Sequence, residues 1–240
     1  MKRILLFLTV LAMLCASCRW IGFRHVKGNG HLSSETRQIA HANRISVSGS
    51  FDVELTQGAT TSVKVEADEN IIPHIVTVEE DGVLKIRPRR NNTSFSSEHS
   101  ITIYITTPTL EQCRIAGSGD IKGAGKFTGD KLLLTIAGSG NIDLDVNTPE
   151  VRAEITGSGN MTLRGETMTE DVHINGMGDY RAEDLKSENA KVRIAGSGDV
   201  KVFADATLEV NIAGSGTVYY KGSATVKQKV MGSGDIKKIE

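Results

Sequence analysis

A three-residue motif, Gly-x-Gly, recurs through the second half of the chain at nearly constant spacing. Successive first glycines lie 21, 19, 19, 20, 18 and 18 residues apart, at Gly117, Gly138, Gly157, Gly176, Gly196, Gly214 and Gly232. A short period with glycine at a fixed phase predicts a stack of similar coils. Glycine suits the corners of such coils because it adopts positive φ and lets two backbones approach closely. We therefore assign these glycines to structural turns.

Apolar and polar residues alternate on both sides of every Gly-x-Gly motif. Two residues before the first glycine stand Ile115, Ile136, Ile155, Ile174, Ile194, Ile212 and Val230. Four residues after it stand Ile121, Ile142, Met161, Tyr180, Val200, Val218 and Ile236. Alternation with a period of two predicts half-buried strands, one on each side of the turn. The expected fold is an all-β solenoid in which each coil adds one strand to each of two parallel sheets.

One outward column supplies an independent indication of register. Five residues before the first glycine, consecutive coils carry charges of alternating sign, at Arg152, Asp171, Lys191, Glu209 and Lys227. Side chains at equivalent positions of a parallel stack lie directly above one another, and opposite charges there are stabilising. The order therefore favours an in-register stack.

The region before the first repeat reads as a degenerate coil followed by a cap. Arg44 to Leu55 alternates, and Gly49 stands where a first corner would fall. Strand-like runs follow, and Asp81-Gly82 is a plausible hairpin turn. We assign residues 42–110 to the first coil and a β capping region, with a flexible loop at 89–99, and residues 111–240 to the coils. A cap is expected because the terminal coils of a solenoid expose unpaired strand edges.

The N-terminus reads as an export signal that ends at a cysteine. Lys2 and Arg3 precede the apolar run Ile4–Leu14, which is too short to span a bilayer. The small residues that follow lead to Cys18 and resemble the bacterial lipobox, which implies lipidation at Cys18. We assign residues 1–18 to a lipoprotein signal peptide and 19–41 to a tether. An ordinary secretory signal with an incidental cysteine is the alternative.

Composition and cysteine usage narrow the possibilities further. The formal net charge of −1 provides no basic field for nucleic acid. Aromatic residues make up only 5% of the chain, so the core must consist of small and β-branched side chains. Cys113 falls at an inward position of the repeat, where a buried cysteine behaves as a small hydrophobe.

Three sequence features together resemble a known family. They are the segment Ser46–Leu55, the run Val83–Ile86 and the iterated Ile-Ala-Gly-Ser-Gly-Asp. They are similar to the bacterial putative auto-transporter adhesin head domains, the head GIN domain family, and the likeness covers about residues 42 to 240. The resemblance implies a single-stranded right-handed parallel β-helix of the pectate-lyase-like type. It also implies a lipoprotein of the Bacteroidetes cell envelope, in the outer membrane and facing either the periplasm or the cell surface.

A polar column follows the corners and admits two interpretations. Three residues after each first glycine stand Asp120, Asn141, Asn160, Asp179, Asp199, Thr217 and Asp235. Asp179 and Asp199 are expected on adjacent coils, where paired carboxylates could attract a cation. Asp and Asn beside glycine also commonly close turns by bonding the backbone, and we favour this interpretation. With Arg181 and Lys201, the two aspartates form the possible ligand or cation face.

An enzymatic interpretation is the main functional alternative. Pectin-degrading enzymes use this fold, and two carboxyls at a suitable separation could act as a glycosidase or lyase pair. Every coil carries a similar dyad, however, whereas a catalytic site is a local exception. We therefore predict no enzyme, no catalytic residue, no cofactor and no metal.

The leading functional hypothesis is a non-catalytic envelope lipoprotein that acts as an adhesin or a glycan- or protein-binding module. The expected partners are the membrane, through the lipid anchor, and a surface glycan or envelope protein. Rows of polar side chains motivate it, including Arg181, Lys201, Tyr219 and Tyr220. The alternatives are a polysaccharide lyase or glycosidase and a self-associating structural envelope protein. The sequence leaves the ligand and the oligomeric state open.

Overall fold

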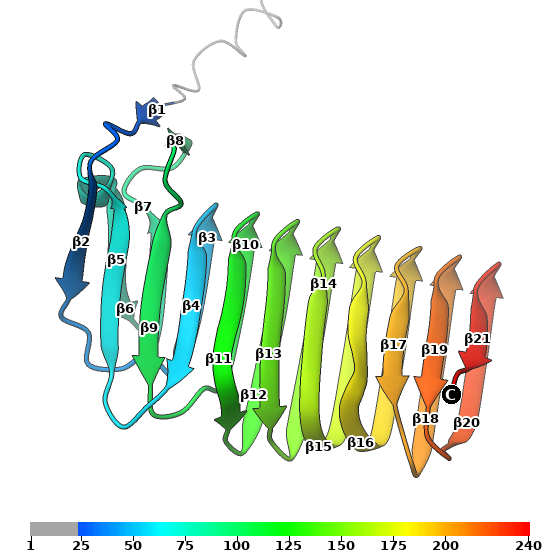
Figure 1. Ribbon diagram of the computed structural model, residues 1–240. Helices are drawn as coiled ribbons and strands as arrows, with labels where there is room; N and C mark the ends of the chain where they lie inside the picture. Colours follow the sequence, from blue (N-terminus) through cyan, green and yellow to red (C-terminus); the bar gives the residue numbers. More distant parts are fainter. Residues whose placement is uncertain (1–23) are drawn as a thin grey trace, which may run out of the picture.

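The computed structural model describes residues 24–240 and shows a β-solenoid (Figure 1). Strands make up 70% of the described residues, and stacked parallel strands form about seven turns. The predicted all-β solenoid is therefore confirmed. Residues 1–23, which include the predicted signal peptide and Cys18, lie outside the described residues.

Each coil contributes one strand to each of two parallel sheets. The first sheet contains the strands that end at a corner glycine: β3 (Arg44–Gly49), β10 (Gln112–Gly117), β12 (Lys131–Gly138), β14 (Glu150–Gly157), the second halves of β15 (Met161–Gly176) and β16 (Tyr180–Gly196), β18 (Thr207–Gly214) and β20 (Thr225–Gly232). The second sheet contains β4 (Asp52–Gln57), β11 (Asp120–Thr128), β13 (Asn141–Asn147), the first halves of β15 and β16, β17 (Val200–Phe203), β19 (Thr217–Lys221) and β21 (Asp235–Lys238).

The corner glycines lie in one continuous column. Gly117 pairs with Gly49 on one side and Gly138 on the other, so the first coil contains Gly49. Both Gly138 and Gly157 have positive φ, at 136° and 123°. A Cβ atom on Gly138 would lie 2.3 Å from the carbonyl oxygen of Gly117. Glycine is therefore required by both its conformation and the close stacking of successive corners.

The interior is filled by the inward columns that the alternation predicted. Ile115, Ile136 and Ile155 are each completely buried and stack in register. In the first coil Phe51 occupies the place of the second glycine, and its ring lies 5.8 Å from that of Phe95. The core is continuous from the capping region into the coils.

Coil length varies through bulges in the second sheet, away from the glycine corners. The 21-residue spacing arises because Lys122 and Lys126 of β11 face Asp143 and Asp145 of β13, which inserts two extra residues. The 20-residue spacing arises because the four residues Arg181–Asp184 of β16 face the three residues Thr162–Arg164 of β15, so that β16 contains one extra residue. The glycine column keeps its register in both cases.

The N-terminal end carries an antiparallel capping region. It contains β5 (Ser62–Asp68), a single 3-10 turn η2 (Ile72–His74), β6 (Ile75–Glu80), β7 (Val83–Pro88) and β9 (Thr102–Thr107). Strands β6 and β7 form a hairpin, and its turn residues Asp81 and Gly82 have φ of 55° and 69°. Parallel pairing of β7 with β3 and of β9 with β4 joins the cap to the coils.

Two segments are more ordered than the sequence predicted. The part of the expected tether that the structure describes contains β1 (Arg24–Lys27) and β2 (Leu32–Arg37), and β2 pairs antiparallel with β5. The expected flexible loop contains β8 (Thr93–Ser96), which pairs with β1. The flexible loop was therefore wrong, and the described part of the expected tether is paired with the cap. The sequence did not indicate these strands because they are mostly polar; backbone pairing orders them, and their few apolar residues, such as Val26 and Phe95, pack against the edge of the core. No helix within residues 24–240 has the length and apolar character needed to cross a bilayer.

Candidate functional site

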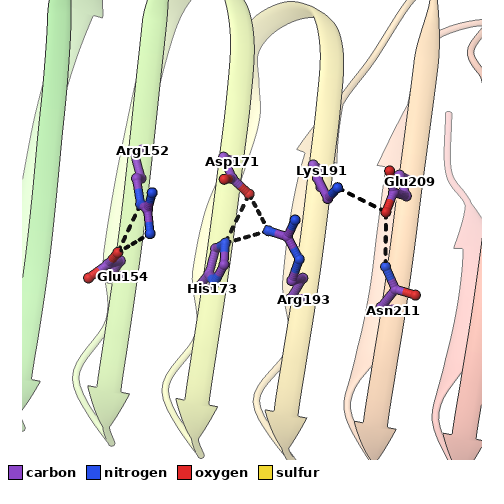
Figure 2. Close-up of polar contacts among 8 residues, drawn as sticks. All are labelled: Arg152, Glu154, Asp171, His173, Lys191, Arg193, Glu209 and Asn211. Carbon is purple, nitrogen blue, oxygen red and sulfur yellow. Dashed lines mark hydrogen bonds and ion pairs between the residues drawn. The ribbon is translucent and has the colours of Figure 1, made fainter.

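The outward face of the first sheet carries two adjacent columns of charged side chains. The predicted column is in register, with Arg152 beside Asp171, Asp171 beside Lys191, and Lys191 beside Glu209. A second column lies two residues further along each strand and consists of Glu154, His173, Arg193, Asn211 and Lys229. Four neighbouring coils thus present a flat row of polar groups (Figure 2).

The two columns are connected to each other as well as along the stack. Asp171 Oδ1 lies 2.8 Å from Arg193 Nη1 and 3.0 Å from His173 Nε2, so this cluster crosses diagonally between coils. Arg152 instead pairs with Glu154 of its own strand, at 2.7 Å. The alternating register was therefore correct, but the sequence could not specify the diagonal pairs, which depend on the reach of the arginine side chains.

One pair follows the predicted column directly. Lys191 Nζ lies 3.1 Å from Glu209 Oε1 on the next coil. A hydrogen bond from Lys191 lowers the pKa of Glu209 below its ordinary value. This carboxylate therefore stays ionised and is already engaged by a neighbouring cation.

A shallow groove lies on the same face beside the corner column. It has a volume of about 280 Å³, and its floor includes the exposed small side chains Ala195 and Ala213. Met231 lines one end and is 58% exposed. The charged residues that line it are cationic or histidine, namely His173, Arg193 and Lys229. Small side chains in the column next to the glycines leave this space between taller neighbours.

The residues singled out as a possible ligand or cation face lie at the starts of strands in the opposite sheet, with Asp179 directly before β16 and Asp199 directly before β17. Asp179 Oδ1 accepts a hydrogen bond from the backbone N–H of Asp199 at 3.1 Å, and Asp179 Oδ2 lies 3.0 Å from Arg181. Asp199 Oδ1 in turn accepts from the backbone N–H of Thr217 at 2.9 Å. Lys201 lies 3.4 Å from Glu183. Both aspartates are thus used in stacking the coils.

The same hydrogen bond recurs along the polar column from the first coil as far as Asp199. At successive rungs the side-chain oxygen accepts from the backbone N–H of the equivalent residue one coil further, as at Asp52, Asp120, Asn141, Asn160, Asp179 and Asp199. The backbone bond that we favoured is present, although it reaches the next coil and not the residue's own turn. Residues 24–240 contain no group of three or more His, Cys, Asp or Glu side chains placed to hold a metal ion.

The predicted tyrosine row is divided between the two faces of its strand. Tyr219 pairs with Lys201 and shares the outward row of Arg181. Tyr220 pairs with Val202, an inward residue, and packs against the core. The interpretation of Tyr220 as part of a polar surface row was therefore wrong, because neighbouring residues of a strand point to opposite faces.

Comparison with known proteins identifies the family to which this repeating fold belongs. Residues 42–224 match the family described as putative auto-transporter adhesin, head GIN domain. The chain belongs to the head GIN domain family. No curated protein matches it.

Solved structures show the same fold. A putative adhesin from Bacteroides fragilis has a TM-score of 0.81 and 23% identity, over 89% of this chain and 100% of its own. A putative lipid binding protein from Parabacteroides distasonis has a TM-score of 0.76 and 27% identity, over 90% and 100%. A putative adhesin from the same species has a TM-score of 0.72 and 26% identity, over 90% and 100%.

The head GIN domain also contains a polar cluster in its cap that sequence reasoning missed. The Asp68 side chain is 1% exposed and accepts hydrogen bonds from Ser97 Oγ at 2.8 Å and from the backbone N–H of Gly30 at 3.2 Å, and its other oxygen lies 2.7 Å from His99 Nδ1. The interaction with His99 is the main cause of a lowered Asp68 pKa. Ser97 donates to the carboxylate and not to the imidazole, so the cluster does not activate a nucleophile. It ties the loop between β1 and β2, the end of β5 and the segment before β9 together.

A second missed group lies inside the coils. Glu170 stands in an inward column between Val151 and Ala190, and its side chain is buried. Tyr180 donates a hydrogen bond to Glu170 Oε1, while Glu170 Oε2 has no partner among the described residues. Burial raises the Glu170 pKa to about 8. The inward column that contains Val151 and Ala190 follows from the repeat, and an acidic residue at the equivalent position of the coil between them was a sequence signal of a buried carboxyl group.

Cys113 lies where the sequence placed it, in an inward column with no exposed surface. Burial raises the pKa of its thiol to about 12. A thiol with that pKa is protonated at neutral pH and is a poor nucleophile.

Proposed function

We propose that this head GIN domain is a non-catalytic, adhesin-type binding module of the cell envelope that holds an extended acidic glycan on the outward face of its first sheet. The observation that carries the proposal is the groove beside the corner column. Its apolar floor of Ala195 and Ala213 suits the face of a sugar ring, and Arg193 and Lys229 suit a carboxylate or sulfate.

The ion pairs around the groove support a preformed binding surface. Asp171 holds Arg193, and Glu209 holds Lys191, so little ordering of these side chains is needed when a ligand binds. The repeat of coils gives the face the extended, regular form that a polymeric ligand requires.

A binding role is favoured over catalysis because the carboxylates of Asp179 and Asp199 already accept hydrogen bonds from the backbone. The two aspartates that could form a glycosidase pair are hydrogen-bonded to the next coil, and the same bond recurs in coils without such a pair. Two of the similar solved structures are described as putative adhesins, in agreement with a binding role.

The experiment compares two substitutions at equivalent positions of different coils. Ala213→Glu fills the groove and places a negative charge beside the ligand, whereas Ala116→Glu makes the same change in the same column outside the groove. With polygalacturonate fragments as the probe, we expect Ala213→Glu to weaken binding by about tenfold or more, because a like charge and lost contact area combine. Isothermal titration calorimetry measures this.

Two controls, the matched variant Ala116→Glu and the neutral polymer dextran, test whether the effect is specific to the groove and to an acidic ligand. Ala116→Glu should bind like the parent, and dextran should bind more weakly than polygalacturonate to all three proteins. Equal weakening by both substitutions, or no binding of polygalacturonate by the parent, would overturn the proposal.

We also propose that Cys18 is the anchor. Its position after an apolar run and small residues supports export and lipidation, which would hold the domain at the outer membrane, facing the periplasm or the cell surface. The membrane would then be the domain's second partner.

A further inference from the structure

The two ends of the solenoid present different strand edges. At the N-terminal end, β2 places Ser33, Glu35 and Arg37 opposite the buried residues of β5, so the outermost inward positions are polar. Strand β6 places Glu79 opposite buried Leu84, and Glu79 is held by His41 at 3.0 Å. Inward-pointing charges of this kind prevent another sheet from adding at an edge.

At the C-terminal end, the inward positions of the outermost strand β20 (Thr225–Gly232) carry no charged side chain that would prevent strand addition. Val226 and Val230 of β20 continue the inward columns of Leu208 and Ile212, and Val230 is 38% exposed. Within residues 24–240, β20 pairs along one side only, with β18. The other side therefore presents free backbone donors and acceptors, with the apolar inward residues Val226 and Val230 on either side of the uncharged polar inward residue Gln228.

The outward positions of this edge are basic. Lys227 continues the column in which charges alternate, directly after Glu209, and Lys229 follows Asn211. Both lysines are exposed, and neither has an ion-pair partner in the described part of the chain. In a continued register, the residue beyond Lys227 would be acidic.

We propose that β20 is a docking edge for an extended strand of another protein, with apolar residues inward and acidic residues opposite Lys227 and Lys229. Backbone hydrogen bonds supply the attachment and the charges select the partner, as in other cases of strand addition. A second copy of this chain is a poorer partner. Its own β20 would bring lysines against lysines, and its N-terminal edges place polar residues inward.

The proposal goes beyond glycan binding because it concerns the free backbone edge of β20. Lys229 lines the groove as well as this edge, so the two proposals share that residue. Ala213→Glu and Val230→Asp separate them, because Ala213 lines the groove and Val230 does not.

The natural neighbour of β20 provides the probe. Residues Thr207–Gly214 pair with β20 from the inner side with Glu209 beside Lys227. A fluorescent peptide with this sequence and Asn211→Glu carries acids opposite both lysines, and a control peptide carries Glu209→Lys and Asn211→Lys instead. We expect the acidic peptide to bind the parent protein about tenfold more tightly in low salt, because two cross-strand pairs change from unlike to like charge in the control.

A charge reversal in the protein completes the test. The double variant Lys227→Glu and Lys229→Glu should prefer the basic peptide by a similar factor in fluorescence anisotropy. Val230→Asp, which puts a charge at an inward position, should weaken both peptides.

Three outcomes would overturn the proposal. They are equal binding of the two peptides, an unchanged preference in the charge-reversed protein, and concentration-dependent self-association of the parent in sedimentation that the peptide cannot displace.

Discussion

Glu170 shows how one residue can set the pH response of an otherwise apolar column. Its carboxyl group is enclosed among aliphatic side chains, with one oxygen bonded to Tyr180 and the other without a partner among the described residues. Burial raises its pKa from 4.5 to about 8. The folded state therefore binds a proton over a pH range in which the unfolded state has lost it.

The sign of the effect on stability follows from this difference. For an acid with a raised folded pKa, the contribution to stability is fully present below the unfolded pKa and is lost as pH rises towards the folded pKa. We expect the free energy of unfolding to fall by about 3–5 kcal/mol between roughly pH 5 and pH 9, because each tenfold difference in acidity between the two states corresponds to about 1.4 kcal/mol. Urea denaturation across this range measures it.

Glu170→Gln should remove most of this pH dependence and make the protein more stable above pH 8, because an amide needs no ionisation. Glu166→Gln, an exposed residue of the same strand, is the control and should keep the parent's pH profile. A parent protein whose stability is flat from acid to alkaline pH would contradict the assignment of Glu170 as a buried acid.

At the scale of the element, the glycine corner combines two requirements that can be separated. Gly176 has φ of 136°, and a Cβ atom there would lie 2.3 Å from the carbonyl oxygen of Gly157. Gly125, in the bulge of β11, has φ of 86° and nothing within 4 Å of such an atom. Conformation is constrained at both glycines, but close stacking is present only at the corner.

Alanine at the two positions should therefore have unequal effects. We expect Gly125→Ala to cost about 1 kcal/mol from the backbone conformation alone. Gly176→Ala should cost at least about 3 kcal/mol, since the coils must also separate locally. Thermal unfolding followed by circular dichroism compares them, and similar losses would show that stacking contributes little to the glycine requirement.

At the scale of the whole molecule, the sequence predicted the parts of the fold that repeat. The solenoid, the inward columns and the in-register charges follow from a period, and a period is visible in a single chain. The strand-like runs and the hairpin turn predicted for the cap correspond to β5, β6, β7 and β9. Strands β2 and β8 were missed, because they carry too few apolar residues to alternate and depend on backbone pairing with distant strands. The groove was not predicted, because it results from the absence of side-chain volume at Ala195 and Ala213.

The proposed anchor determines where the whole molecule resides, and it can be tested directly. Cells fed a clickable palmitate analogue should label the parent protein but not Cys18→Ser, whereas Cys113→Ser should label normally because that thiol is buried. Labelling that persists in Cys18→Ser, or that is absent from the parent, would show that the cysteine is incidental to an ordinary secretory signal.

Because of the bulges in the second sheet, a coil can gain residues without changing the register of its corner glycine with the neighbouring coils. Extra residues are accommodated between Lys122 and Lys126 and between Arg181 and Asp184, while every corner glycine still faces its counterpart. A lineage could therefore lengthen a single coil on one face, and so change what that face recognises, without moving any other coil.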